Sequence, residues 1–286
     1  MLAAGAQFSR EKLLQIARSL PADLQVLAAL SEMLQDINSE LDEVATLLRR
    51  DVALAARIVR ISNSPMFGGG SGVASIEEAV NRVGFSEILK LVGTATTARY
   101  AERALEHYAI GALPLRDNML YGALAAEALA QAAGAEPRVA YMAGLVRPLG
   151  MMVLDRAGRG NLQWTDRYDP ERFLSYSAWE GSIFGIDSLA VSTLILDEWR
   201  FPRDVIGAIR SHHLDRPDDF DNKLACVLNL AGCLTKQAGR AFVGELPWWE
   251  VTEEKLSYAG LRADQLEPAS AVVAAAFEAA AAALAV

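Results

Sequence analysis

The sequence predicts an all-α protein made of two helical lobes. Apolar residues recur three or four positions apart from one end of the chain to the other, which is the period of an amphipathic helix. No convincing run of alternating β-branched residues stands between turn signals, so strands are not expected. A length of 286 residues is enough for two compact units, since domains commonly hold roughly 100 to 200 residues.

Start and stop signals divide the first lobe, residues 10–110, into about five helices. Its first clear apolar face is formed by leucines spaced three and four apart: Leu24, Leu27, Leu30 and Leu34. Ser39 with Asp42 predicts the start of the next helix, and Asp51 is suited to cap the third. Proline and glycines at 65–70 prevent that third helix from continuing.

A second capping box, Ser75 with Glu78, marks the next helix of this lobe. Gly84 is a plausible C-terminal stop, and a long helix is then expected from Ser86 toward Tyr108. Glycine and proline at 111–114 break the helical pattern, and we place the boundary between the lobes there.

The second lobe, residues 113–240, opens with an alanine-rich helix whose small side chains suit close packing. Pro137 is well placed at a helix start, and Asp187 is a good N-cap. Helical spacing predicts the helices of this lobe over 116–133, 137–147, 171–184, 188–199, 203–213 and 221–237.

A C-terminal extension, residues 244–286, follows the second lobe. Trp248 and Trp249 come after a proline, and packing of these indoles onto the body is favoured over an exposed contact patch. The stretch 269–286 is apolar but mostly alanine, and Glu278 stands near its middle. We therefore expect a packed terminal helix rather than a membrane span.

Composition argues against several classes of protein. The net charge of -9 opposes binding to phosphate backbones, so no nucleic acid partner is expected. Cys226 and Cys233 are the only cysteines, and on one helix their Cα atoms would lie about 10 Å apart, too far for a disulfide. Without a secretory signal at the N-terminus, the chain is expected to be cytoplasmic and to bind no membrane.

No local motif in the sequence indicates an enzyme. The glycines at 68–72 lack the Lys-Ser or Lys-Thr pair of a P-loop, and the segment 75–92 has the outline of a helix-turn-helix without its basic cluster. Neither Gly-x-Ser-x-Gly nor Cys-x-x-Cys occurs. His212 and His213 form the only histidine pair, which is interpreted equally well as part of a metal site or as a solvated helix end.

Taken together in order and spacing, several short motifs resemble the HDOD family, the output-domain relatives of the HD phosphohydrolases. The motifs are LP at 20–21, DVALAARIVRISNS at 51–64, SIEEAVNRVG at 75–84, AGLVRPLG at 143–150, FGID at 184–187, EWRFP at 198–202 and AIRSHH at 208–213. The resemblance covers roughly residues 13–234. It implies a two-lobed helical fold, no hydrolase activity and a role in bacterial signal transduction.

Catalytic HD relatives hold one or two metal ions through histidines and aspartates, and the metal activates a water. The resemblance aligns their His-Asp doublet with Arg147 and Pro148, which place a permanent cation and a ring without a donor atom there. The aspartate near the end of the HD enzymes' pattern aligns with Gly232. We therefore expect no bound metal, no cofactor and no catalytic residue.

The remaining aligned positions are Asp117 for the first histidine, Ser188 for a further histidine, and His212 or His213 for the one that survives. These seven residues are expected to line a cleft between the lobes. There Arg147 would either bind a phosphate or carboxylate, or be exposed or ion-paired.

The expected function is a regulatory module that binds a signalling protein or a small ligand. The alternative is a metal-dependent phosphohydrolase with an altered ligand set that includes Asp117, His212 and His213. A DNA-binding regulator is disfavoured by the acidic balance.

Overall fold

A computed structural model describes residues 8–20, 23–33, 40–68, 72–99 and 104–285 of the chain. Within these residues all regular structure is helical, apart from an isolated antiparallel bridge between Leu105 and Ile110. The predicted fold class is confirmed. Leu34, Ser39 and the glycines at 69–70, for which predictions were made, lie outside the described residues.

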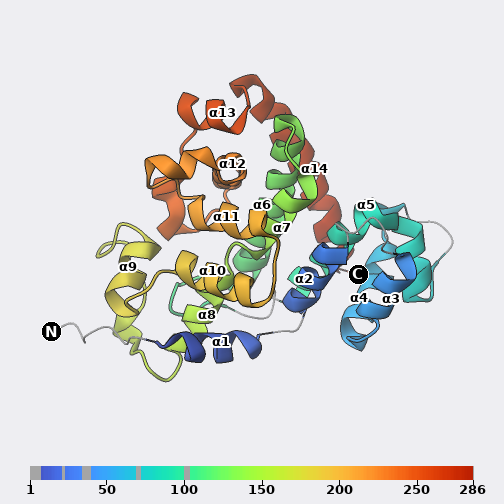
Figure 1. The fold of residues 1–286 in the computed structure, drawn as a ribbon, viewed down its shortest axis with the longest axis horizontal. Coiled ribbons are helices and arrows are strands. Elements are labelled where there is room, and N and C mark those ends of the chain that lie inside the picture. The colour runs from blue at the N-terminus through green and yellow to red at the C-terminus, as the bar shows by residue number, and fades with distance from the viewer. Residues whose placement is uncertain (1–7, 21–22, 34–39, 69–71, 100–103, 286) are drawn as a thin grey trace.

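The first lobe is a small bundle in which α5 packs against α2, α3 and α4. Figure 1 shows α3, α4 and α5 grouped at one end of the molecule. The bounds are α2 (Asp23–Met33), α3 (Leu41–Leu48), α4 (Val52–Ser62), η1 (Pro65–Phe67) and α5 (Ile76–Thr97).

Side-chain caps begin two of these helices where they were predicted. Asp51 accepts a hydrogen bond from the backbone N–H of Leu54 at 3.0 Å, and Ser75 accepts one from Glu78 at 3.1 Å. Helix α5 is broken at Gly84, where φ is +69°, a backbone conformation that glycine adopts without strain. The predicted helix toward Tyr108 is too long, because α5 ends at Thr97.

Helix α1 (Arg10–Arg18) packs against α8 and α10 of the second lobe rather than within the bundle of α2 to α5. Its start is capped by Ser9, and the ring of Phe8, just before it, lies 6.0 Å from the ring of Phe184. The N-terminal helix thus belongs spatially to the second lobe.

The second lobe is built around α6, which packs against α7, α12 and α14. Its bounds are α6 (Ala112–Ala133), α7 (Pro137–Val146), α8 (Leu149–Gly158), η3 (Trp164–Asp166), α9 (Tyr176–Ile183), α10 (Ser188–Glu198), α11 (Arg203–Ser211), η4 (Pro217–Asp221) and α12 (Lys223–Gln237). Helices α9 and α12 begin later than predicted, because Ser175 and Asn222 cap them.

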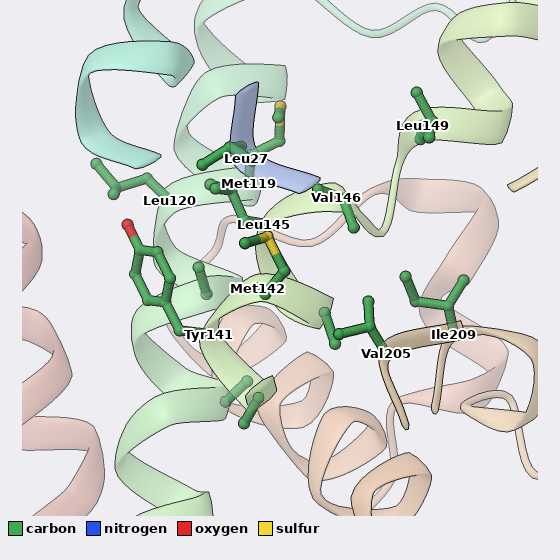
Figure 2. Close-up of a cluster of buried hydrophobic side chains, with 14 of the residues drawn as sticks. Leu27, Met119, Leu120, Tyr141, Met142, Leu145, Val146, Leu149, Val205 and Ile209 are labelled. Atoms are coloured by element: carbon green, nitrogen blue, oxygen red, sulfur yellow. The ribbon is translucent and has the colours of Figure 1, made fainter. Parts of the chain in front are cut away.

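The hydrophobic core continues from one lobe into the other. Figure 2 shows Leu27 of α2 among fully buried side chains of α6, α7 and α11, such as Met119, Met142 and Val205. The lobes are in close contact at Gly93 of α5, where a Cβ would lie 2.7 Å from the hydroxyl of Tyr141. This continuity makes the two lobes one packed body.

The C-terminal extension comprises η5 (Val243–Trp248), α13 (Glu253–Ala259), η6 (Ala263–Gln265) and α14 (Leu266–Ala285). Helix α14 runs beside α6 and also contacts η1 and α5, so it touches both lobes (Figure 1). The segment Ala263–Ala285 is long and apolar enough to cross a membrane, a test that core helices of globular proteins also pass. One face of it is packed, with the ring of Phe277 5.6 Å from that of Tyr121.

Candidate functional site

Arg147 lies at the C-cap of α7 and is the centre of a buried polar cluster. Its side chain is 7% exposed, and its guanidinium donates to the carboxylate of Glu245 on η5 and to the side-chain oxygen of Asn118 on α6. Burial raises the pKa of Glu245, and the cation of Arg147 opposes that rise. Arg147 and Glu245 are both removed from water, so each buried charge is stabilised by the other.

Trp249 covers this cluster from the C-terminal extension. Its ring is buried, and the guanidinium carbon of Arg147 lies 5.7 Å from the centroid of the indole and 5.8 Å from that of Phe242. The indole also lies directly over Gly232 of α12, where a Cβ would come within 2.7 Å of the ring. The space that a side chain at position 232 would need is filled by Trp249.

The two adjacent histidines follow α11 and stack on the tryptophans. The ring of His212 lies 5.8 Å from that of Trp249, and the ring of His213 lies 3.8 Å from that of Trp248 at an interplanar angle of 12°. Packing of the tryptophan pair onto the body, as predicted, is what the structure shows.

The interpretation of the histidine pair as a solvated helix end is wrong, because both side chains are buried. Burial, together with the positive charge of Arg147, lowers the pKa of His212 to about 3. The pKa of His213 is lowered well below its ordinary value, first by burial and then by His212 and Arg147. Both imidazoles are therefore neutral at neutral pH.

Several buried polar atoms of this cluster have no hydrogen-bond partner among the described residues: His212 Nε2, both ring nitrogens of His213, Asn229 Oδ1 and Glu245 Oε2. The amide of Asn229 donates to the carbonyl of His212 at 2.8 Å, so the two side chains are neighbours. Buried polar atoms without partners are rare in folded proteins, so several in one place make this cluster a candidate site.

Asp117 and Ser188 do not join this cluster through any contact found among the described residues. Asp117 is ion-paired with Arg116 at 2.5 Å and lies 3.7 Å from Arg240. Ser188 begins α10, where its N–H donates to the carboxylate of Glu180 at 2.7 Å.

Pro148 forms the junction between α7 and α8, one residue from Arg147. The structure thus brings together Arg147, Pro148, Gly232, His212 and His213.

The predicted position of this site, in a cleft between the lobes, is wrong. The residues that surround Arg147 come from α6, α11, α12 and η5, all in the second lobe or the extension. The opening beside it is a cavity of about 580 Å³ lined by His213, Asp215, Arg216 and residues of α10. The site at Arg147 itself is filled by the chain's own Glu245 and Trp249.

Sequence reasoning missed Asn118, Glu245 and Phe242. Asn118 follows the predicted Asp117, and one step along a helix turns the side chain by about 100°. Because of that rotation, the side chain of Asn118 contacts Arg147, whereas the side chain of Asp117 contacts Arg116 and Arg240. Glu245 stands 98 residues from Arg147, and the only local signal near it was the tryptophan pair.

The family model of the HDOD domain matches residues 20–214. A curated relative, an uncharacterized protein of Treponema pallidum (strain Nichols), is 23% identical over 243 residues, which make up 84% of this chain and 46% of the relative. The chain therefore spans about half the length of that relative.

Several solved structures share the fold. An HDOD domain protein of unknown function from Geobacter sulfurreducens has a TM-score of 0.71 at 21% identity, covering 96% of this chain and 98% of that one. A protein from Marinobacter aquaeolei VT8, named as a candidate signal transduction protein, gives 0.66 at 20% identity, covering 93% and 58%. A candidate phosphohydrolase from Shewanella amazonensis SB2B gives 0.61 at 20% identity, covering 94% and 97%.

A divalent metal of the kind used by HD phosphohydrolases does not fit the residues at this site. Arg147, which the resemblance aligns with the metal-binding doublet, places a buried guanidinium here, and its charge would repel a cation. An indole fills the space over Gly232. The described part of the chain contains no group of three or more His, Cys, Asp or Glu side chains able to hold a metal ion.

Proposed function

Because this chain belongs to the HDOD domain family, we propose that it is a bacterial, cytoplasmic signal-transduction module that binds a partner protein or a small ligand and does not hydrolyse phosphate esters. The name of the Marinobacter structural relative supports the signalling role. The net charge of -9 argues against a nucleic acid partner. No cofactor is part of the proposal.

The observation that carries this proposal is a buried ion pair covered by an indole, at the positions that the resemblance aligns with metal ligands of HD enzymes. Arg147 is held by Glu245 and Asn118, and Trp249 covers both Arg147 and Gly232. Activating a water for hydrolysis requires a Lewis acid or a positioned general base. The neutral imidazole of His212 is a candidate base beside Arg147, and the ring of Trp249 stacks on it.

Metal analysis combined with a hydrolysis assay tests the proposal. The full chain, purified without chelators and then supplemented with manganese, iron or zinc, should retain no stoichiometric metal. Its hydrolysis of nucleotides and cyclic dinucleotides should equal that of a heat-denatured sample. Bound metal together with activity that disappears in His212→Ala would instead establish the phosphohydrolase alternative, which the name of the Shewanella structural relative favours.

A further inference from the structure

The segment 242–249, which we call the acidic-aromatic segment, connects α12 to α13 and covers the site. Glu245 and Trp249 point inward and are 4% and 2% exposed, whereas Val243 and Leu246 are 57% and 37% exposed. Its inward side chains contact the site, while Val243 and Leu246 on its outer face meet solvent.

The surface beneath this segment has the features of a receptor for an acidic residue and an aromatic ring. Arg147, which is itself held by the side-chain oxygen of Asn118, donates to the carboxylate of Glu245. A guanidinium is the side chain best suited to bind a carboxylate. Gly232, which has no side chain, leaves room for an indole, and the ring of His212 stacks on it. Buried aromatic and arginine anchors of this kind are the residues that dominate protein–protein binding energy.

The fit between the receptor and the chain's own segment is incomplete. The Nδ1 of His212 lies 2.7 Å from the carbonyl of Ile209, so in the neutral ring Nδ1 carries the proton and Nε2 is an acceptor. That Nε2 atom, Asn229 Oδ1 and Glu245 Oε2 are all buried acceptors for which the described part of the chain offers no donor. A buried polar atom without a partner lowers stability, which reduces the advantage of the internal segment over a competitor.

We propose that this receptor also binds a segment of a partner protein that presents a carboxylate residue and, four positions later, a tryptophan. The chain's own acidic-aromatic segment then acts as an internal competitor. The inference rests on the proposed function in that it names the partner's chemistry, and it makes the C-terminal extension the element that controls access.

A tethered segment competes strongly, because a short linker holds it at an effective concentration in the millimolar range. An external peptide of equal intrinsic affinity would therefore bind the intact chain only weakly. Weakening the internal segment without touching the receptor should release binding to the external one.

The test uses a fluorescent peptide of residues 240–252, RAFVGELPWWEVT, and the full-length chain, with fluorescence anisotropy as the readout. Chain variants Glu245→Gln and Trp249→Ala should bind the peptide at least tenfold more tightly than the wild-type chain. Leu246→Ala, on the outer face of the same segment, is the matched control and should bind like the wild type. Circular dichroism establishes that each variant is folded.

Changes in the peptide provide a second arm in which the chain is the same in every measurement. Peptides carrying Glu245→Gln or Trp249→Ala should lose binding to the weakened chains, and a Leu246→Ala peptide should keep it. Equal binding of all peptides, or no binding to either weakened chain, would overturn the proposal. Wild-type dimers that exchange their segments would also overturn it, by assigning the receptor to a second copy of this chain.

Hydrogen exchange of the wild-type chain gives a measurement that needs no variant. The amides of residues 243–249 should exchange by local opening, well before those in the middle of α6 and α12. Exchange of the segment only together with those helices would contradict the proposal. None of these results depends on metal or hydrolysis, so failure here is distinguishable from failure of the proposed function.

Discussion

The indole of Trp249 lies over the Cα of Gly232, so close that a Cβ at position 232 would be 2.7 Å from its ring. Position 232 is where the resemblance to HD enzymes expects an aspartate. Glycine at position 232 and tryptophan at position 249 are complementary. Without the indole, the glycine would leave a cavity, and with a larger residue at position 232 the indole would clash. The extension and α12 are thus matched to each other.

Substitution of Gly232 by alanine should therefore destabilise the protein. The added methyl group must push the buried indole away, and overpacking of this kind costs about 1–3 kcal/mol. Urea unfolding followed by circular dichroism measures the loss. A stability equal to or above that of the wild type would show that the contact between Gly232 and Trp249 is not tight.

The matched control is Gly181→Ala in α9, where a Cβ would meet nothing within 4 Å. Alanine favours a helix over glycine by roughly 0.5–1 kcal/mol. This variant should be as stable as the wild type or slightly more stable, which separates the clash from any general effect of removing a glycine.

Replacing only one member of the buried pair Arg147 and Glu245 should be far more damaging than replacing both. Arg147→Met leaves a desolvated carboxylate without its cation, a change that costs about 3–5 kcal/mol. Arg147→Met combined with Glu245→Gln removes the uncompensated charge and should recover part of that loss. A double-mutant cycle of unfolding free energies measures the coupling.

The exposed pair Arg203 and Asp197 serves as a reference for this cycle, since their side chains are 87% and 49% exposed. Surface pairs contribute about 0–1 kcal/mol. A coupling in the buried pair as small as in this exposed pair would show that Arg147 and Glu245 do not stabilise each other, and that this ion pair does not hold the extension on the site.

Features set by neighbouring residues could be predicted from the sequence, because capping and helix breaking act over a few positions. Asp51, Ser75 and Asp187 cap helices where expected, and Gly84 breaks α5 where a stop was expected. The all-α class follows from the same periodicity. The packing of α1 on α8 and α10 was not predicted, because the residues in and around α1 do not indicate which helices it contacts.

The centre of the site could be foreseen only in part. Arg147 and Gly232 were identified because they depart from a family pattern, but the residues that complete the site come from far along the chain. The burial of both histidines depends on Trp248 and Trp249, whose contacts join η5 to the end of α11. Contacts of this kind are fixed by tertiary packing and leave no periodic signal.

The two cysteines should be unreactive in the native protein. Cys226 and Cys233 are free and buried on α12, and burial raises the pKa of each thiol to about 11. Because the thiolate is the nucleophile, alkylation by iodoacetamide at about pH 8 should be slow. Mass spectrometry should find both labelled after denaturation and neither before, whereas rapid native labelling would indicate that α12 opens readily.

Glu180 should make stability depend on pH in a direction unusual for a carboxylate. It is fully buried on α9, where the hydroxyl of Tyr108 donates to Oε1 at 2.6 Å and the N–H of Ser188 donates to Oε2 at 2.7 Å. Burial raises its pKa from 4.5 to about 7, and the nearby Asp187 adds to the rise, although both hydrogen bonds oppose it. The folded state therefore prefers the protonated acid.

Below about pH 4.5 both folded and unfolded chains carry the protonated acid, and the stabilising contribution of Glu180 is fully present. As the pH rises toward 7, the unfolded chain ionises first, so this contribution falls by about 3 kcal/mol and is lost above pH 7. Glu180→Gln has no such dependence. The difference in unfolding free energy between wild type and Glu180→Gln should therefore shift against the wild type between about pH 4 and 8.

Comparing the two proteins is necessary because His212 and His213 act in the opposite direction. Their pKa values are lowered on folding, so their contribution is present above about pH 6.5 and is lost as the pH falls. Both histidines are present in each protein, and their contribution cancels in the difference. A difference that stays constant across this pH range would mean that the pKa of Glu180 is the same in the folded and unfolded chains. The hydrogen bonds from Tyr108 and Ser188 would then stabilise its charge as much as burial opposes it.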